Sequence, residues 1–203
     1  MGCCCSCLDG DGESAKEAEM TSKLSSQAKG MKISRAMSAP TIEIEEGVKI
    51  SGDGLGVAGV NIEQDSAYWE WHIDASDGSG KAEDTKFGVT TKKDQKFYRS
   101  LEEQDDVSPQ TDGTALMKKV PICDGDTIGV AVQQSDLPMV QFLVNGEPQH
   151  NLAINRFRGN VYPSIFLAPG ENVKAKLVLD ENEFLQEAPN ARFGPIILAR
   201  GII

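Results

Sequence analysis

The sequence predicts an all-β protein, an antiparallel β-sandwich preceded by a polar N-terminal stretch. After Pro40, short apolar or alternating segments are separated by turns rich in Gly, Asp, Asn and Pro, which is the pattern of β-strands. No convincing helical periodicity lies between these segments, so the crossover helices that a parallel sheet requires are missing. The chain has 203 residues, which leaves room for one domain of ordinary size and a tail. We assign the sandwich to residues 41–187.

The clearest strand is the segment 68–74, in which apolar and polar side chains alternate. Residues that are two apart share one face of a strand. The residues expected to face the core are Trp69, Trp71 and Ile73. The residues expected to face solvent are Glu70, His72 and Asp74.

Later segments repeat this behaviour and end in recognisable turns. The expected strands are 86–91, 128–132, 140–144, 161–167 and 173–179. The turns are Asp124-Gly125, Asn145-Gly146 and Pro169-Gly170. Asn-Gly between two apolar segments is the strongest short signal for a β-hairpin.

Taken in order, five pieces of this pattern resemble the SPRY domain family over roughly residues 45–185. The pieces are Tyr68-Trp-Glu-Trp-His-Ile73, Phe87-Gly-Val89, Asp124-Gly-Asp-Thr-Ile-Gly-Val130, Val140-Gln-Phe-Leu-Val-Asn-Gly146 and Val161-Tyr-Pro-Ser-Ile165. One departure is that the segment 93–113 lacks the tryptophan that often follows the second piece. The resemblance implies a concanavalin-like jelly roll that binds a peptide or protein partner through loops at one end. Because those loops vary within the family, no partner-contacting residue is transferred.

The N-terminus fits a lipid anchor within residues 1–8. Met1-Gly-Cys-Cys-Cys-Ser6 matches the pattern for N-myristoylation, which would modify Gly2 after removal of Met1. One acyl chain binds a membrane only marginally, so stable anchoring needs a second signal. The candidates for S-palmitoylation are Cys3, Cys4, Cys5 and Cys7. The alternative is a cysteine-rich start without a function.

The anchor, and not a membrane-spanning helix, predicts the location of the protein. No stretch approaches 18 consecutive apolar residues, the length of a transmembrane helix. A secretory signal is disfavoured because Asp9 and Asp11 follow the cysteines closely. We expect the cytoplasmic face of a eukaryotic membrane.

Residues 9–40 are expected to form a flexible linker, with a weak helix over 15–30 as the alternative. The run Asp9-Gly-Asp-Gly-Glu13 has the alternating acids of a calcium loop, but Ser14 and Met20 stand where an EF-hand requires Gly and Glu. We therefore reject a calcium loop. Ser34 and Ser38 are candidate phosphorylation sites, the latter preceded by Arg35.

The C-terminal extension, residues 188–203, is too apolar for a free end. We expect it to dock on the sandwich, with a partner-binding tail as the alternative.

An enzyme is not expected. His72 should lie on an outward face and His150 beyond a hairpin, and neither is paired by sequence with a nucleophile. We expect Cys123 to be a small, semi-buried residue. The two histidines are distant from the cysteine cluster and from each other, so we predict no metal and no cofactor.

Two other binding classes remain open. One is a lectin-like sandwich that holds a carbohydrate or calcium, the latter through the acidic loop 101–112. The other is a membrane-tethered scaffold whose sandwich has no pocket. Sandwich folds of this kind serve all these functions, so the fold alone does not choose between them.

The charge limits the partners. The net charge is −11, which opposes a nucleic-acid partner held by a broad basic surface. Residues 1–40 hold five basic and five acidic residues, so the whole excess belongs to the sandwich and its extension. The sequence thus predicts a monomeric, membrane-anchored adaptor for a protein or peptide partner.

Overall fold

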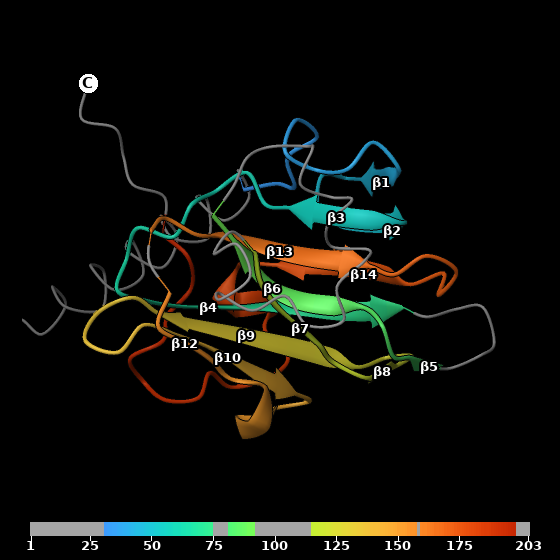
Figure 1. Ribbon diagram of the computed structural model, residues 1–203. Helices are drawn as coiled ribbons and strands as arrows, with labels where there is room; N and C mark the ends of the chain where they lie inside the picture. The colour runs from blue at the N-terminus through green and yellow to red at the C-terminus, as the bar shows by residue number, and fades with distance from the viewer. Residues whose placement is uncertain (1–30, 75–80, 92–114, 158, 198–203) are drawn as a thin grey trace, which may run out of the picture.

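The computed structural model describes residues 31–74, 81–91, 115–157 and 159–197 (Figure 1). Two antiparallel sheets face each other, which confirms the predicted sandwich. The larger sheet has the order β1-β2-β14-β4-β9-β10-β11, with β12 also paired to β10; the smaller has the order β3-β13-β6-β7, and β5 pairs with β8. The strands of the larger sheet are β1 (Ile42–Glu45), β2 (Lys49–Gly52), β4 (Ser66–Asp74), β9 (Thr127–Gln133), β10 (Met139–Val144), β11 (Glu147–Pro148), β12 (Ile154–Asn155) and β14 (Lys174–Val178). The other strands are β3 (Gly54–Val57), β5 (Lys81–Ala82), β6 (Lys86–Thr90), β7 (Ala115–Lys119), β8 (Ile122–Cys123) and β13 (Tyr162–Leu167). The structure also has two short 3-10 helices, η2 (His150–Leu152) and η3 (Glu181–Glu183).

Strand β4 lies between β14 and β9 in the larger sheet. Its inward side chains Trp69 and Trp71 are fully buried, as the alternation predicts. Burial of each such side chain contributes about 1.5–3 kcal/mol. Phe142 of β10 and Phe87 of β6 join the same core.

Two glycines of the sequence motifs are explained by close approach. Gly88 in β6 has a φ of +150°, and a Cβ atom there would lie 2.1 Å from the backbone oxygen of Leu116 in β7. A Cβ atom on Gly129 would lie 2.5 Å from the hydroxyl of Tyr68, so this glycine leaves the space that the tyrosine ring fills. Both motifs therefore serve packing and not chemistry.

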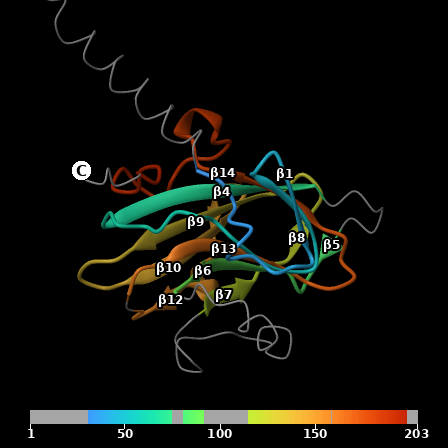
Figure 2. The same cartoon turned by 90° about the horizontal axis from the view of Figure 1, so that it is seen from above.

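The outer face of β4 differs from the expectation. Tyr68 and Glu70 are fully buried, because the chain after β14 crosses over them. A second apolar cluster forms there from Tyr68, Ala131, Leu143 and Phe193, with Phe184 and Ala188 packed against it. Figure 2 shows this segment, in red, lying over β4. The expectation that Glu70 faces solvent is wrong, since alternation reports the local period and not what covers each face.

The C-terminal extension is held by the backbone as well as by side chains. Gly194 pairs with Ala67 in a parallel bridge, and its oxygen accepts the N–H of Tyr68 at 2.8 Å. Phe193 and Ile196 are buried. Residues 188–197 are thus part of the folded domain.

The segment 31–40 also belongs to the fold, so the expected linker ends too late at residue 40. Met31, Ile33 and Ala39 are buried, and Ile33 forms a bridge with Ala58 that covers the edge strand β3. Ser38 is fully buried and its hydroxyl accepts the N–H of Val57 at 3.0 Å. Ser38 is therefore closed to a kinase in the folded protein, whereas Ser34 is half-buried.

Candidate interaction surface

Four chain segments meet at one end of the sandwich. They are residues 58–65, 134–138, 156–161 without 158, and 194–197, and we call this surface the loop end. Figure 1 shows the connections β3–β4 and β9–β10 projecting at the same side of the molecule. Each segment joins or follows strands of a sheet, so the sandwich fixes where all four begin.

Side chains from two loops cross-link this end. The amide nitrogen Nε2 of Gln134 donates to the carbonyl oxygens of Ile62 and Gln64, both at 2.8 Å. Asp65 accepts the N–H of Gln134 through its backbone oxygen at 2.7 Å and the N–H of Ser135 through Oδ1 at 2.8 Å. Hydrogen bonding with Ser135 lowers the pKa of Asp65 below its ordinary value. The β9–β10 loop is therefore held against the β3–β4 connection.

Gln64 attaches the C-terminal segment to the same loops. Its Nε2 donates to the oxygens of Ser66 and Pro195 at 2.9 and 2.8 Å, and its Oε1 accepts the N–H of Ile197 at 2.7 Å. One amide side chain thus joins segments that are more than 130 residues apart in the sequence.

The loop end presents apolar side chains to solvent. Leu137 is 70% exposed and Ile197 is 48% exposed. Asp136 and Arg156 have φ values of +55° and +65°, which cost free energy in residues other than glycine and occur often at binding sites. The two loops are joined where the N–H of Arg156 donates to the oxygen of Pro138 at 2.7 Å. Leu137 and Ile197 are therefore exposed apolar side chains on segments that hydrogen bonds hold in place.

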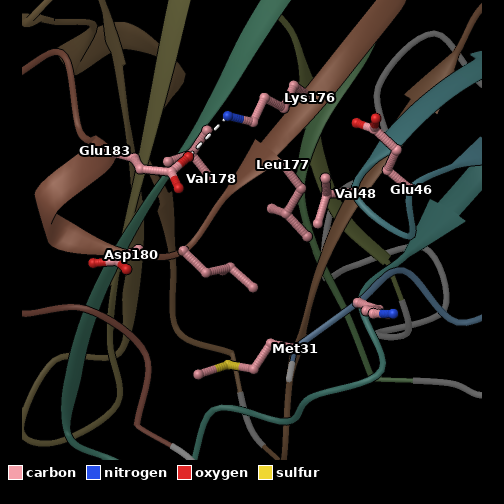
Figure 3. A pocket seen from close by; sticks show the side chains of 10 residues that line it. Met31, Glu46, Val48, Lys176, Leu177, Val178, Asp180 and Glu183 are labelled. Atoms are coloured by element: carbon pink, nitrogen blue, oxygen red, sulfur yellow. Dashed lines mark hydrogen bonds and ion pairs between the residues drawn. The ribbon is translucent and has the colours of Figure 1, made fainter. Parts of the chain in front are cut away.

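Two hollows lie on the face of the larger sheet. One, of about 230 Å³, is lined by residues that include Met31, Glu46, Lys176 and Glu183 (Figure 3). The other, of about 450 Å³, lies over β1, β2, β14 and β4. Neither is lined by Phe, Tyr or Trp, whereas small-molecule sites are mostly apolar and aromatic. These two hollows therefore give no support to a lectin-like sugar site.

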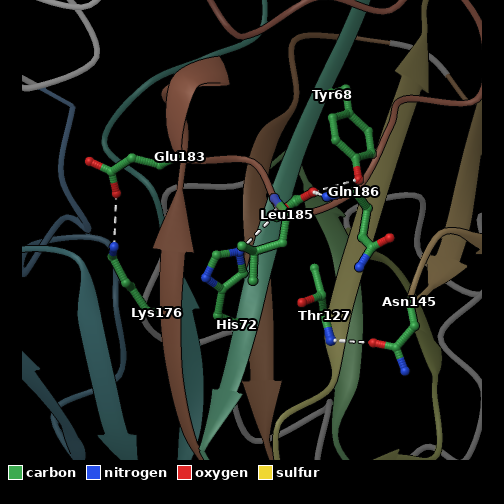
Figure 4. A network of polar contacts seen from close by, with 9 residues as sticks. Tyr68, His72, Thr127, Asn145, Lys176, Glu183, Leu185 and Gln186 are labelled. Atoms are coloured by element: carbon green, nitrogen blue, oxygen red, sulfur yellow. Dashed lines mark hydrogen bonds and ion pairs between the residues drawn. The ribbon is translucent and has the colours of Figure 1, made fainter.

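A buried carboxylate ties the chain after β14 to the sheet (Figure 4). The two oxygens of Glu70 accept from the hydroxyl of Tyr68 at 3.1 Å, from Nε2 of His72 at 2.8 Å, and from the N–H groups of Leu185 and Gln186 at 2.8 Å each. Burial alone would raise the pKa of Glu70, but these hydrogen bonds outweigh it and the pKa is lowered. Burial, with Glu70 beside it, raises the pKa of Tyr68. The carboxylate therefore stays ionised and accepts four hydrogen bonds.

This network was missed in the sequence because its parts are far apart along the chain. The one signal was the pair of aromatic residues Phe184 and Phe193 in an otherwise polar stretch. The ring of Phe184 packs edge-on against Tyr68 at 5.2 Å between centroids.

The other residues singled out in the sequence do not assemble into a catalytic site. The side chain of His72 is 22% exposed and bonded to Glu70, while His150 is exposed in η2. Cys123 is exposed, so its expected partial burial is wrong. Within the described ranges, no three His, Cys, Asp or Glu side chains are grouped so that they could hold a metal ion.

Several predicted features lie outside the described residues. These are Gly2, Cys3, Cys4, Cys5, Cys7, the loop 101–112 and residues 198–203. Among the described residues, no helix has the length and apolar character needed to cross a bilayer.

Comparison with known proteins rests on structure alone. No protein-family model matches the sequence, and no curated protein sequence matches it. The SPRY domain of human HERC1 is similar with a TM-score of 0.54 and 16% sequence identity, over 75% of this chain and 99% of that one. The NHR1 domain of Drosophila melanogaster Neuralized has a TM-score of 0.49 and 12% identity, over 73% of this chain and 97% of that one. A human SPRY domain has a TM-score of 0.45 and 19% identity, over 73% of this chain and 96% of that one. The likeness to the HERC1 domain spans nearly all of that domain, so this chain has the SPRY-like antiparallel β-sandwich fold.

Proposed function

We propose that this protein is a lipid-anchored interaction module whose loop end binds a protein or peptide partner. The observation that carries the proposal is Leu137, an aliphatic side chain 70% exposed on a hydrogen-bonded loop. Because the loop is already fixed, binding there orders few additional groups, and most of the gain from burying Leu137 is kept.

The surroundings of Leu137 fit a protein partner better than a small molecule. Ile197 adds a second exposed apolar side chain at the same end, and Gln64 and Asp65 hold the two segments through hydrogen bonds to Ile197 and Ser135. Protein interfaces combine apolar side chains with polar groups in this way. The SPRY-like fold supports the same function, since the family resemblance implies partner binding through end loops.

The membrane part of the proposal rests on the N-terminal sequence. Gly2 would carry myristate, and one or more of Cys3, Cys4, Cys5 and Cys7 would carry palmitate. Two acyl chains suffice for stable anchoring where one does not. The anchor would place the acidic domain near the cytoplasmic leaflet, and the protein would act there as an adaptor.

Proximity labelling in cells tests both parts with three chains that carry the labelling enzyme at the C-terminus. Gly2→Ala should move the protein from the membrane fraction to the soluble fraction and lose membrane neighbours. Leu137→Asp should stay in the membrane fraction and lose a discrete set of labelled proteins. Leu185→Asp is the matched control, because Leu185 is also exposed, at 64%, but lies away from the loop end on the segment bound to Glu70.

The outcomes separate the two claims. A Gly2→Ala protein that remains fully membrane-bound would overturn the acylation mechanism. A Leu137→Asp protein with unchanged labelled neighbours would overturn the loop end as the binding surface.

A further inference from the structure

The larger sheet leaves part of its outer face open. The chain after β14 covers the side chains of β4 and β9 that form the second apolar cluster. The groove of about 450 Å³ occupies the remaining area over β1, β2, β14 and β4. Its lining is mixed, and it holds three lysines, Lys49, Lys174 and Lys176, and three acids, Glu43, Glu45 and Asp74.

The strand register brings these lysines together. Lys176 of β14 lies directly opposite Lys49 of β2. Like charges opposite each other in neighbouring strands destabilise a sheet. Lys174 lies two residues before Lys176 and therefore on the same face. We call these three residues the lysine strip. The strip spans the two neighbouring strands β2 and β14, whose axes lie about 5 Å apart.

The lysine strip is only partly neutralised. Lys49 pairs with Glu46 at 2.9 Å and Lys176 with Glu183 at 2.8 Å, and both acids lie outside the strands. These ion pairs are largely exposed, so each contributes little free energy. Lys174 has no ion pair or side-chain hydrogen bond in the part of the chain that the structure describes. Lys174 and Lys176 thus form a line of positive charge along β14, between the acidic side chains that also line the groove.

Acidic side chains border the strip on both sides. Glu45 of β1 lies opposite Lys49, and Asp74 of β4 lies opposite Lys174. An anionic ligand is therefore confined to a narrow line along β14. A single extended chain with acids on one face fits this line, while a broad anionic surface does not.

The sequence contains such a segment. In Asp9-Gly-Asp-Gly-Glu13 the acids occur at every second position, the same period as Lys174 and Lys176 in a strand. In an extended conformation the three acids share one face. Gly10 and Gly12 carry no side chain, so the backbone can approach the sheet closely.

The tether has the reach that docking requires. Met31 lines the hollow next to the groove, and Lys176 lines both. A flexible chain of 17 residues, the number from Ser14 to Gly30, would span about 20–25 Å on average. Tethering raises the local concentration of the run to about the millimolar range, so weak contacts suffice.

We propose that the acidic run Asp9–Glu13 docks as an extended segment along the lysine strip, with its carboxylates facing Lys174 and Lys176. The contact holds the N-terminal end of the chain against the open face of the larger sheet. It uses a different face from the loop end and does not depend on acylation, so it goes beyond the proposed function and can fail separately from it.

Paramagnetic relaxation in solution tests the contact with the full 203-residue chain made without acylation. The five native cysteines are replaced by serine and a nitroxide is attached at Ser14→Cys. At an ionic strength of about 0.05 M, the amide signals of Ser51 and Lys174 should lose most of their intensity, and those of Leu116 in the other sheet should not. Raising the ionic strength to about 0.5 M should restore the signals, because exposed charges are then screened.

Charge reversal makes the test specific. Lys174→Glu should restore the signals, and adding Asp9→Lys and Asp11→Lys to that variant should broaden them again. Lys119→Glu is the matched control, because the same change is made on the other sheet and should leave the broadening intact. Lys174 is exposed, so its variant should fold, and a single Asp11→Lys change weakens the contact without touching the domain.

Three results would overturn the proposal: no broadening of Ser51 and Lys174 at low ionic strength, broadening that survives both Lys174→Glu and Asp11→Lys, or equal broadening over both sheets.

Discussion

The carboxylate of Glu70 accepts the backbone N–H of Leu185 at 2.8 Å, across 115 residues of sequence. With the N–H of Gln186 it fixes the point where the chain after β14 turns over the sheet. The segment that follows supplies Phe193 to the second apolar cluster and Ile197 to the loop end. A buried charge in β4 thus helps to position both the covered face of the sheet and part of the candidate binding surface.

Removing the Glu70 carboxylate should strongly destabilise the protein. Glu70→Ala leaves the buried hydroxyl of Tyr68 and three partly buried donors without an acceptor, and breaking a buried charged network costs about 3–5 kcal/mol. Glu70→Gln keeps the shape but turns an amide NH2 toward backbone N–H groups, and should cost about 1.5–3 kcal/mol. Urea unfolding measures the loss of unfolding free energy in both variants. Glu45→Gln is the control, because Glu45 is exposed and its loss should be near zero. Equal stability of Glu70→Gln and wild type would show that the network contributes nothing.

Stability should fall in acid, and Glu70 should carry part of the loss. The pKa of Glu70 is lower in the folded protein than its ordinary value of 4.5. A group with a lowered folded pKa stabilises the protein above the unfolded pKa and loses that contribution as the pH falls through the folded pKa. The free energy of unfolding of wild type should therefore drop below about pH 4.5. Glu70→Gln should show a smaller drop, and parallel curves for the two proteins would contradict this assignment.

The strands were predictable because their information is local. Trp69 and Trp71 alternate with polar residues, and the φ values of +50° and +83° at Asn145 and Gly146 confirm the expected hairpin turn. The same alternation gave the wrong environment for Glu70, since its cover comes from a segment that no local period reveals. Residue 40 was similarly a poor boundary, because Met31 and Ile33 cover a strand edge that only the folded sheet creates.

The loop end could not be assembled from the sequence for the same reason. Gln134 reaches Ile62 across 72 residues, and Gln64 reaches Pro195 across 131. Amide side chains are common, and nothing in the sequence marks these two as cross-links. The local signal that did exist was Leu137, a large aliphatic residue within the turn Ser-Asp-Leu-Pro.

Gly88→Ala should be among the most damaging single substitutions in the small sheet. The new Cβ atom would lie 2.1 Å from the oxygen of Leu116, and φ is +150°. Because that contact is with backbone, relief requires β6 and β7 to separate, and the cost should be at least about 1–3 kcal/mol. Gly194→Ala is the matched control, since no atom lies within 4 Å of its added Cβ and no positive φ is involved. Thermal melting compares the two; a small effect at Gly88 would contradict the close approach.

Phe193→Ala should show how much the docked C-terminal extension contributes. Phe193 is buried against Tyr68, Ala131 and Leu143, and loss of a buried phenylalanine costs about 3–5 kcal/mol in a well-packed site. Leu185→Ala changes an exposed residue of the same segment, and its free energy of unfolding should stay within about 0.5 kcal/mol of the wild-type value. Equal melting temperatures for the two variants would mean that the extension does not stabilise the domain.

Gln134 should act on partner binding through Leu137. Gln134→Ala removes two hydrogen bonds to the β3–β4 connection, so the loop that carries Leu137 is held only by its bonds to Asp65 and Arg156, and the loss should cost about 1–2 kcal/mol of stability. Leu137→Asp should leave stability within about 0.5 kcal/mol, because the side chain is exposed. Both variants should lower labelling of the proteins that depend on Leu137.

In a Leu137→Asp background, Gln134→Ala should then have no further effect on labelling while it still lowers the melting temperature. This non-additivity is the signature of two residues that serve one contact. Independent, additive losses of labelling would instead show that Gln134 contacts the partner by itself.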